Sequence, residues 1–118
     1  FMAISRYHAG KGTKGPVRLI KDLEEPVEDQ HVLFVEDVID TGLTLRYLLR
    51  NLKARHPASL EVCTLFDKPP HRLANIPVKY KGFDLPDRFV VGYGLDYKEA
   101  YRHLPFVAEL TPESLGLK

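Results

Sequence analysis

The 118-residue sequence has one cysteine, no tryptophan and no apolar stretch long enough to span a membrane. Because Cys63 is alone, an internal disulfide framework is excluded, and a reducing compartment such as the cytoplasm is expected. A transmembrane helix would need a run of about 18 apolar residues, and none is present. The first residues also lack the pattern of a signal peptide, so we expect no contact with a membrane.

An excess of charge of either sign is also absent, because 17 lysines and arginines stand against 16 aspartates and glutamates. Proteins that bind double-stranded nucleic acid usually carry a basic face, so nucleic acid is not an expected partner. With 44% apolar and 28% charged residues, the composition is that of a folded chain. We expect one domain over residues 1–118, although the apolar start at Phe1 indicates a chain that lacks its N-terminal part.

Two short apolar runs flank an amphipathic segment in the middle of the chain. His31–Val35 and Leu60–Phe66 are rich in β-branched residues, which is typical of strands buried on both faces of a parallel sheet. Between them, leucines at positions 45, 48, 49 and 52 follow the spacing of one helix face. This order predicts an α/β protein with a mainly parallel, doubly wound sheet. Ligands of such sheets bind beyond the carboxyl ends of the strands.

Shorter elements are expected on both sides of this unit. One or two helical turns are expected over Tyr97–His103, and residues 7–16, with three glycines and two lysines, are expected to form a mobile loop. Further strands are expected at Val17–Ile20, Val78–Phe83, Phe89–Val91 and Phe106–Leu110.

The densest group of chemically active side chains is Val35–Thr44. Glu36 and Asp37 end the first apolar run, Asp40 follows, and Thr41-Gly42-Leu43-Thr44 leads into the helix. The glycine, the two hydroxyls and the backbone N–H groups at a helix start form a site for a phosphate monoester. The adjacent carboxylates suit sugar hydroxyls or a Mg²⁺ that accompanies the substrate. Together these groups indicate a ribose 5-phosphate as ligand.

This stretch resembles the phosphoribosyl-pyrophosphate motif of the type I phosphoribosyltransferase family. Leu65–Pro69 is similar to the strand-end lysine segment of the 6-oxopurine enzymes of that family. Gly82–Tyr97, with Arg102 after it, resembles the C-terminal signature of the hypoxanthine-guanine phosphoribosyltransferases. The resemblance implies the type I phosphoribosyltransferase fold and a role in purine salvage. Ribose 5-phosphate would pass from phosphoribosyl pyrophosphate to hypoxanthine or guanine, giving IMP or GMP and pyrophosphate.

The same resemblance implies a role for each residue of these segments. Asp40 would be the general base that faces N7 of the purine, and Lys68 would donate to its O6. Phe89 would stack on the purine, and Val90 would bind the purine edge through backbone groups. The remaining expected binding residues are Thr41, Gly42, Leu43 and Thr44 at the 5′-phosphate, Glu36 and Asp37 at the ribose hydroxyls, and Asp96 and Arg102 at the pyrophosphate.

Mg²⁺ is the cofactor that the resemblance implies, with the carboxylates of Glu36, Asp37 and Asp96 as its ligands. The family generally forms dimers or tetramers, so a homo-oligomer is expected. Residues 7–16 resemble the family's mobile loop, although Arg6 stands where the family usually has serine. The family's pyrophosphate-binding loop would precede Phe1, and we therefore expect weak or no catalysis by the chain alone.

Two other functions fit parts of the sequence. A receiver-like phosphoacceptor signalling domain also has an acidic pair at one strand end and a Lys-Pro pair at another, as in Lys68-Pro69. Such domains take the phosphorylated aspartate from a separate strand and have no T-G-x-T turn on the acidic loop. A non-catalytic, phosphoribosyltransferase-like regulator would bind the same ligand without turnover. Asp40 argues against the regulator, because binding alone needs no base.

Overall fold

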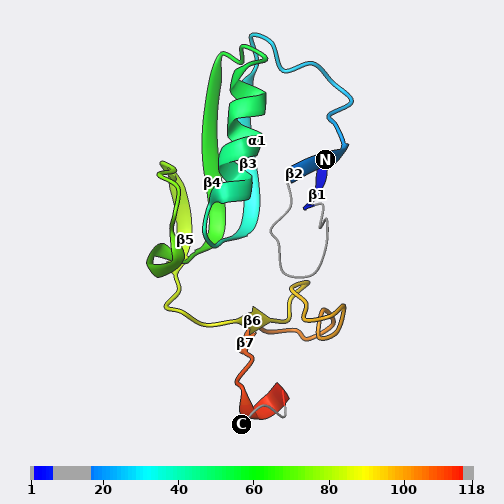
Figure 1. Cartoon of the computed structure of the whole chain (residues 1–118), viewed down its shortest axis with the longest axis vertical. Helices are drawn as coiled ribbons and strands as arrows, with labels where there is room; N and C mark the ends of the chain where they lie inside the picture. Colours follow the sequence, from blue (N-terminus) through cyan, green and yellow to red (C-terminus); the bar gives the residue numbers. More distant parts are fainter. Residues whose placement is uncertain (1, 7–16, 116–118) are drawn as a thin grey trace. The chain divides into compact units, whose positions relative to one another are not determined.

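The computed structural model describes residues 2–6 and 17–115, and the chain divides into two compact units, Phe1–Asp84 and Leu85–Lys118 (Figure 1). The expected mobile loop at residues 7–16 lies outside the described residues. Each unit has strands of its own and is described by itself. The single domain expected over residues 1–118 stays a prediction.

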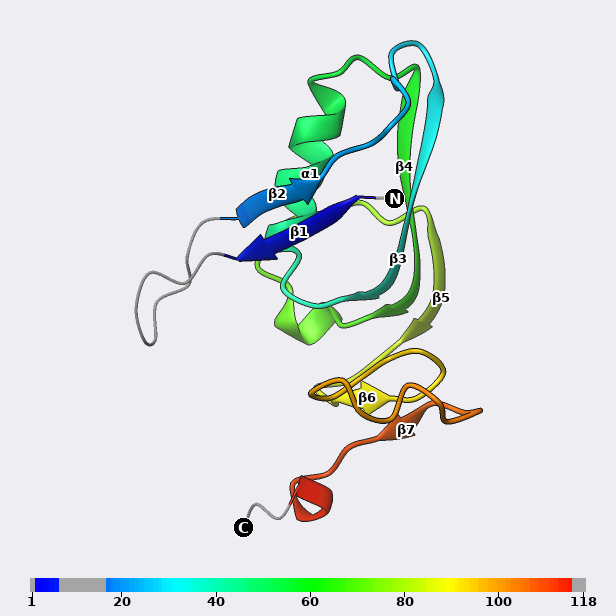
Figure 2. The same cartoon turned by 90° about the vertical axis from the view of Figure 1, so that its right-hand side faces the viewer.

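A three-stranded parallel sheet forms the centre of the first unit. Its strands are β3 (His31–Ile39), β4 (Ser59–Asp67) and β5 (Tyr80–Asp84), in the order β3-β4-β5. Helix α1 (Leu43–Lys53) connects β3 to β4 and lies along the sheet (Figure 2). This parallel pairing with a helical crossover confirms the expected α/β class.

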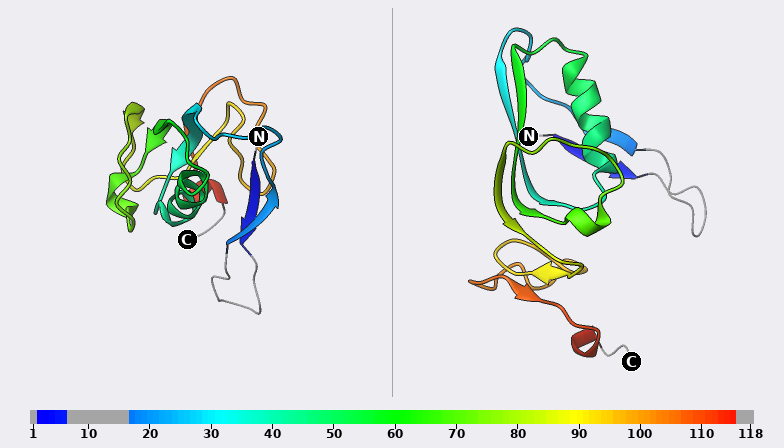
Figure 3. Two further views of the ribbon diagram at one scale, coloured as in Figure 1. Left: turned by 90° about the horizontal axis from the view of Figure 1, so that it is seen from above. Right: turned by 90° about the vertical axis from the view of Figure 1, so that its left-hand side faces the viewer.

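Helix α1 packs on one face of this sheet through its leucines. Figure 3 shows the helix against one face of the sheet. Leu45, Leu48 and Leu52 are buried, whereas Arg46 and Arg50 on the other side of the helix are exposed. Each leucine buried in this way stabilises the fold by about 1.5–3 kcal/mol relative to an exposed one. The core under the helix consists of Ile39, Leu45, Val62, Ala74 and Ile76, with Phe34, Leu43, Leu49 and Val78 packed against it.

The opposite face of β3 is exposed, so the expected burial of this strand on both faces was wrong. Leu33 is 52% exposed and Val35 69% exposed, whereas Phe34 between them packs against the core. Successive side chains of a strand point to opposite faces. Among the described residues of the first unit, α1 is the only helix longer than three residues, and it covers one of those two faces.

Short elements complete the described ranges. None of their helices combines the length and the hydropathy that crossing a membrane requires. The short elements of the first unit are the antiparallel strands β1 (Ala3–Arg6) and β2 (Val17–Lys21) and the 3₁₀ turn η1 (Pro69–His71). Those of the second unit are the antiparallel strands β6 (Val90–Val91) and β7 (Ala108–Glu109) and the 3₁₀ turn η2 (Glu113–Leu115).

The helical turns expected over Tyr97–His103 do not form, and that expectation was wrong. Lys98 and Glu99 have φ values of 50° and 64°, in the left-handed region that a right-handed helix excludes. The chain turns back at these two residues, and a β-bridge pairs Tyr97 with Ala100. The tight turn therefore overrides the helical preference of the local sequence.

Gly42, directly before α1, is a position that no other residue fits well. Its φ is 82°, and a Cβ atom there would lie 2.8 Å from Ile76 Cδ1 and 3.1 Å from Arg72 Cδ. We expect Gly42→Ala to lower the free energy of unfolding by roughly 2–4 kcal/mol, which sums about 1–2 kcal/mol of backbone strain and the cost of overpacking. Urea denaturation of the variant measures this loss.

Gly94→Ala is the matched control for this substitution. Gly94 has a φ of 93°, but no atom lies within 4 Å of the place that its Cβ would occupy. The control should therefore lose only the backbone part, about 1–2 kcal/mol. Equal losses in both variants would show that Ile76 and Arg72 do not restrict Gly42.

Candidate functional site

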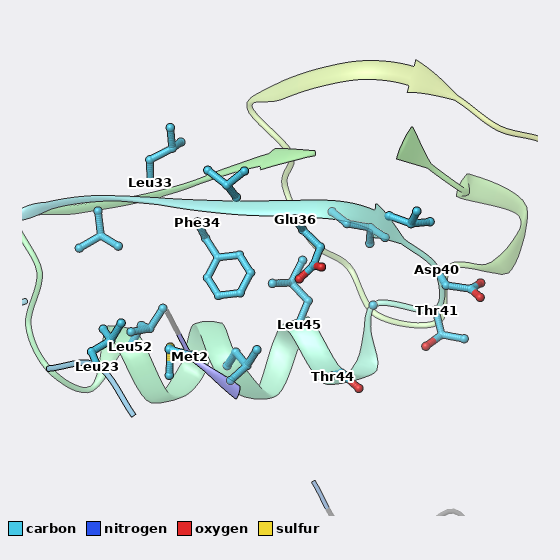
Figure 4. A pocket seen from close by; sticks show the side chains of 16 residues that line it. Met2, Leu23, Leu33, Phe34, Glu36, Asp40, Thr41, Thr44, Leu45 and Leu52 are labelled. Carbon is cyan, nitrogen blue, oxygen red and sulfur yellow. The ribbon is translucent and has the colours of Figure 1, made fainter. Parts of the chain in front are cut away.

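Five of the expected site residues line one pocket between β3 and α1, namely Glu36, Asp40, Thr41, Gly42 and Thr44. The pocket has a volume of about 850 Å³ and a mostly apolar wall that includes Phe34 and leucines of α1. Asp40, Thr41 and Thr44 lie together at one end, and Glu36 points from β3 into the pocket (Figure 4). The structure thus brings the expected base, phosphate-binding hydroxyls and one ribose-binding carboxylate to one place. Asp37 lines a second, smaller pocket of about 500 Å³, which Glu36 also borders.

The turn between β3 and α1 presents backbone donors. The first hydrogen bond within the helix runs from Arg46 N to Gly42 O, at 2.8 Å, so the N–H groups of residues 43–45 precede it. Leu43 N reaches Thr41 Oγ1 only at 3.4 Å, a long and weak contact. N–H groups at a helix start, with the positive end of the helix dipole, attract an anion. The geometry of residues 41–45 therefore suits a phosphate group.

A segment after β4 crosses this turn and holds its backbone. The segment is His71–Ile76, called the strap below. Leu73 N and Ala74 N both donate to Thr41 O, at 2.8 and 3.2 Å. The turn is therefore held in place by hydrogen bonds from a neighbouring part of the chain as well as by its own conformation.

Arg72 in the strap links the ends of two strands. Its Nη2 donates to the carboxylate of Asp67, the last residue of β4, and its Nε lies 3.4 Å from Asp40 O, just after β3. Lys81 Nζ lies 3.8 Å from the second carboxylate oxygen of Asp67. Asp67 is 6% exposed, and two cations compensate its buried charge.

The side chain of Asp40 also contacts the strap. Its Oδ1 lies 2.7 Å from His71 Nδ1, and the Asp40 side chain is 54% exposed. His71, Arg72 and Asp67 are not among the site residues expected from the sequence. Their position could have indicated them, because they flank the end of β4, and the carboxyl ends of parallel neighbours share one edge of the sheet.

Lys68, the expected purine contact, is buried at the same edge. It is 6% exposed, and its backbone N–H donates to Ile39 O, the last residue of β3, at 3.0 Å. This bond attaches the Lys68 backbone to the strand that precedes Asp40. The burial excludes a solvated surface lysine, and a lysine is almost never fully buried without a partner. Its contact with a purine stays a prediction.

The carboxyl group of Glu36 has an unusually high pKa. Burial raises its pKa to about 7 from an ordinary value of 4.5, and the carboxylate of Asp37 beside it adds to the rise. A nearby cation would favour the ionised form, since an opposite charge lowers the pKa of a carboxyl. The acidic pair is therefore electrostatically suited to a positively charged ligand.

The remaining expected residues belong to the second unit. Phe89 packs edge-on against Tyr97, with ring centroids 5.8 Å apart, and Val90 pairs with β7. Asp96 Oδ1 lies 3.4 Å from Arg102 Nη2, so these two charges neighbour each other. The contact of these expected residues with the pocket of the first unit stays a prediction.

The carboxylates of Glu36 and Asp37 suit a metal ion that is bound to the substrate. Within residues 2–6 and 17–115, no three His, Cys, Asp or Glu side chains cluster in a way that could hold a metal. Glu36 and Asp37 are adjacent in sequence, and Mg²⁺ is commonly bound by one or two carboxylates together with phosphate oxygens of the substrate. The donor set therefore fits Mg²⁺ bound jointly by protein and substrate.

Residues 1–98 match the phosphoribosyl transferase domain family. The hypoxanthine-guanine phosphoribosyltransferase of Mycobacterium avium is 54% identical over 112 residues, which cover 95% of this chain and 55% of that protein. The Staphylococcus aureus enzyme of the same name is 50% identical over 113 residues, covering 96% of this chain and 63% of that protein. The chain thus spans 55–63% of the length of these relatives.

Solved structures show the same similarity. A hypoxanthine phosphoribosyltransferase from Staphylococcus aureus has a TM-score of 0.87 at 50% identity, covering 96% of this chain and 61% of that one. A mutant of the Trypanosoma cruzi enzyme, in a ternary substrates complex, has a TM-score of 0.88 at 41% identity, covering 98% and 62%. These structures confirm the expected type I phosphoribosyltransferase fold.

The raised pKa of Glu36 predicts a stability that falls with pH. Because the folded-state pKa of about 7 exceeds the ordinary 4.5, the contribution is complete below about pH 4.5 and is lost as the pH rises through 7. We expect a loss of roughly 1–3 kcal/mol between pH 5 and 8, after allowing for the partial exposure of Glu36. Urea denaturation at a series of pH values, without divalent cations, measures it.

Glu36→Gln should remove this pH dependence, because its amide stays neutral. Glu28→Gln, at an exposed position, is the control and should keep the dependence of the unchanged protein. A flat stability profile in the unchanged protein, or the same profile in Glu36→Gln, would contradict the burial of a titrating Glu36.

Proposed function

The chain belongs to the phosphoribosyl transferase domain family, and on this premise we propose that it transfers ribose 5-phosphate from phosphoribosyl pyrophosphate to hypoxanthine or guanine. The products would be IMP or GMP and pyrophosphate, which is a purine salvage reaction. The observation that carries the proposal is the pocket in which Glu36 and Asp40 lie with the donor turn 41–45. Relatives 50–54% identical that are named hypoxanthine-guanine phosphoribosyltransferases support the choice of purine.

The turn would bind the 5′-phosphate. Backbone N–H groups of Gly42, Leu43 and Thr44, with the hydroxyls of Thr41 and Thr44, would surround its oxygens. Glu36 and Asp37 would accept hydrogen bonds from the ribose hydroxyls. Because the strap holds the turn, the donors need little reorganisation when the phosphate arrives, and less ordering entropy is lost on binding.

Asp40 would act at the purine ring. Placed beside N7, its carboxylate would accept the proton that the ring releases as the bond to C1′ of the ribose forms. The transition state has oxocarbenium character, so most of the rate acceleration would come from orientation and from charge stabilisation. One base is therefore enough acid–base chemistry for this reaction.

Lys68 would select the base. Its ammonium would donate to O6 of hypoxanthine or guanine, and an adenine would present an amino group there instead. The adenine would leave a buried charge without its acceptor, which is a strong basis for discrimination. The burial of Lys68, at 6% exposure, supports this role.

Residues of the second unit would have binding roles of their own. Phe89 would stack on the purine, Val90 would bind its edge, and Arg102 would pair with the pyrophosphate. Mg²⁺, held by Glu36, Asp37 and Asp96 with substrate oxygens, would neutralise charge on the leaving pyrophosphate. We propose a cytoplasmic homo-oligomer, a dimer or a tetramer, as the working form. The receiver-like alternative has no support from the family match.

Asp40→Asn tests the enzyme against the regulator that only binds. Removing the base should lower kcat about 10²–10⁴-fold, while the Kd for phosphoribosyl pyrophosphate changes only a few-fold. Steady-state nucleotide formation and calorimetric titration with Mg²⁺ present measure the two quantities, in a form of the protein extended to the length of its relatives. Asp29→Asn, an exposed position, is the control and should keep the full rate.

An unchanged kcat in Asp40→Asn would contradict the role of Asp40 as base. If the protein, in a form extended to the length of the relatives that it matches, binds phosphoribosyl pyrophosphate and forms no nucleotide from any 6-oxopurine, the regulator is the correct function.

A further inference from the structure

The carboxylate of Asp40 contacts the imidazole of His71. His71 Nδ1 lies 2.7 Å from Asp40 Oδ1, and the Asp40 side chain is 54% exposed, so packing does not fix its orientation. A base must present a lone pair toward the proton it accepts, and rotation about the side-chain bonds of an exposed aspartate is nearly free. The histidine contact is therefore a restraint on the orientation of this side chain.

His71 itself is held relative to the end of β3. It ends the 3₁₀ turn η1, and its backbone N–H donates to Lys68 O at 3.1 Å. Lys68 N in turn donates to Ile39 O at 3.0 Å, one residue before Asp40. Two successive backbone hydrogen bonds thus connect the backbone of His71 to the last residue of β3, directly before Asp40.

We propose that His71 is a positioning residue that donates its Nδ1–H to Oδ1 of Asp40 and leaves Oδ2 directed at the substrate. The ring is then the Nδ1–H tautomer when it is neutral, because its partner is an acceptor. This inference rests on the proposed function for the role of Asp40, although the hydrogen bond itself does not. His71 would not touch the substrate and would act through Asp40 alone.

A merely structural role makes a different prediction. The His71 side chain is 34% exposed and its partner 54%, and exposed ion pairs contribute little to stability. Loss of His71 should therefore leave the fold intact and lower kcat with little change in the KM for phosphoribosyl pyrophosphate. A structural residue would change both constants together.

Three variants separate these roles. His71→Asn places an amide nitrogen close to the position of Nδ1, whereas His71→Gln places its amide further out and His71→Ala has no donor. We expect kcat to fall about 10–100-fold in His71→Ala and His71→Gln, and to recover to within about threefold in His71→Asn. His31→Ala is the matched control, because His31 Nδ1 makes a similar contact of 2.8 Å with Ser59 Oγ at the start of β3.

The tautomer of the His71 ring can be measured without catalytic turnover. Long-range ¹H–¹⁵N spectra at alkaline pH should show neutral His71 as the Nδ1–H tautomer, and as the Nε2–H tautomer in Asp40→Ala. An Nε2–H tautomer in the unchanged protein, an unaltered kcat in His71→Ala, or equal losses in all three variants would overturn the proposal. Activity is measured in a form extended to the length of the relatives. Inactivity of that extended protein would overturn the proposed function, and the positioning role with it, whatever the tautomer.

Discussion

The carbonyl of Thr41 accepts two backbone hydrogen bonds, from Leu73 and Ala74, and the arrangement of the site depends on this contact. It joins the turn that follows β3 to the strap that follows β4. A turn without such partners would be a surface loop with many conformations, and ordering it would oppose ligand binding. Here the entropy of the turn is lost during folding, so less ordering is left for the moment at which a ligand binds.

The ion pair of Asp67 and Arg72 strengthens the same junction. Asp67 is 6% exposed, and removing either partner would leave a buried charge that costs several kcal/mol. Arg72 also approaches Asp40 O at 3.4 Å, so the pair joins the edge of the sheet to the start of the turn. The geometry of the expected base and the stability of the sheet edge are therefore coupled through one guanidinium group.

The sequence predicts the central unit well because its signals are local. The leucine spacing locates α1 closely, since helix period and burial coincide there. Strand β3 continues to Ile39, beyond the expected end at Val35, because its pairing with β4 extends past the charged Glu36 and Asp37. A hydrophobic pattern ends at the first charge, whereas a hydrogen-bonded ladder need not.

Other features could not be predicted in this way. The strap His71–Ile76 has no periodic pattern, and its bonds to the turn join residues about 30 positions apart. The turn at Lys98 and Glu99 depends on left-handed backbone conformations, which lysine and glutamate side chains do not predict. Conversely, the acidic motif follows from its place at the end of a strand, where ligands of parallel sheets bind. The role of Lys68 is implied by the resemblance to the phosphoribosyltransferase family.

The central claim is that the turn at residues 41–45 binds the phosphate of a ribose 5-phosphate. The most direct test is a titration of the ¹⁵N-labelled protein with ribose 5-phosphate, followed through its backbone amide resonances. The account predicts that the amides of Gly42, Leu43, Thr44 and Leu45 shift together and saturate with one Kd. Saturable shifts confined to residues outside this turn, or no shifts at millimolar ligand, would contradict it.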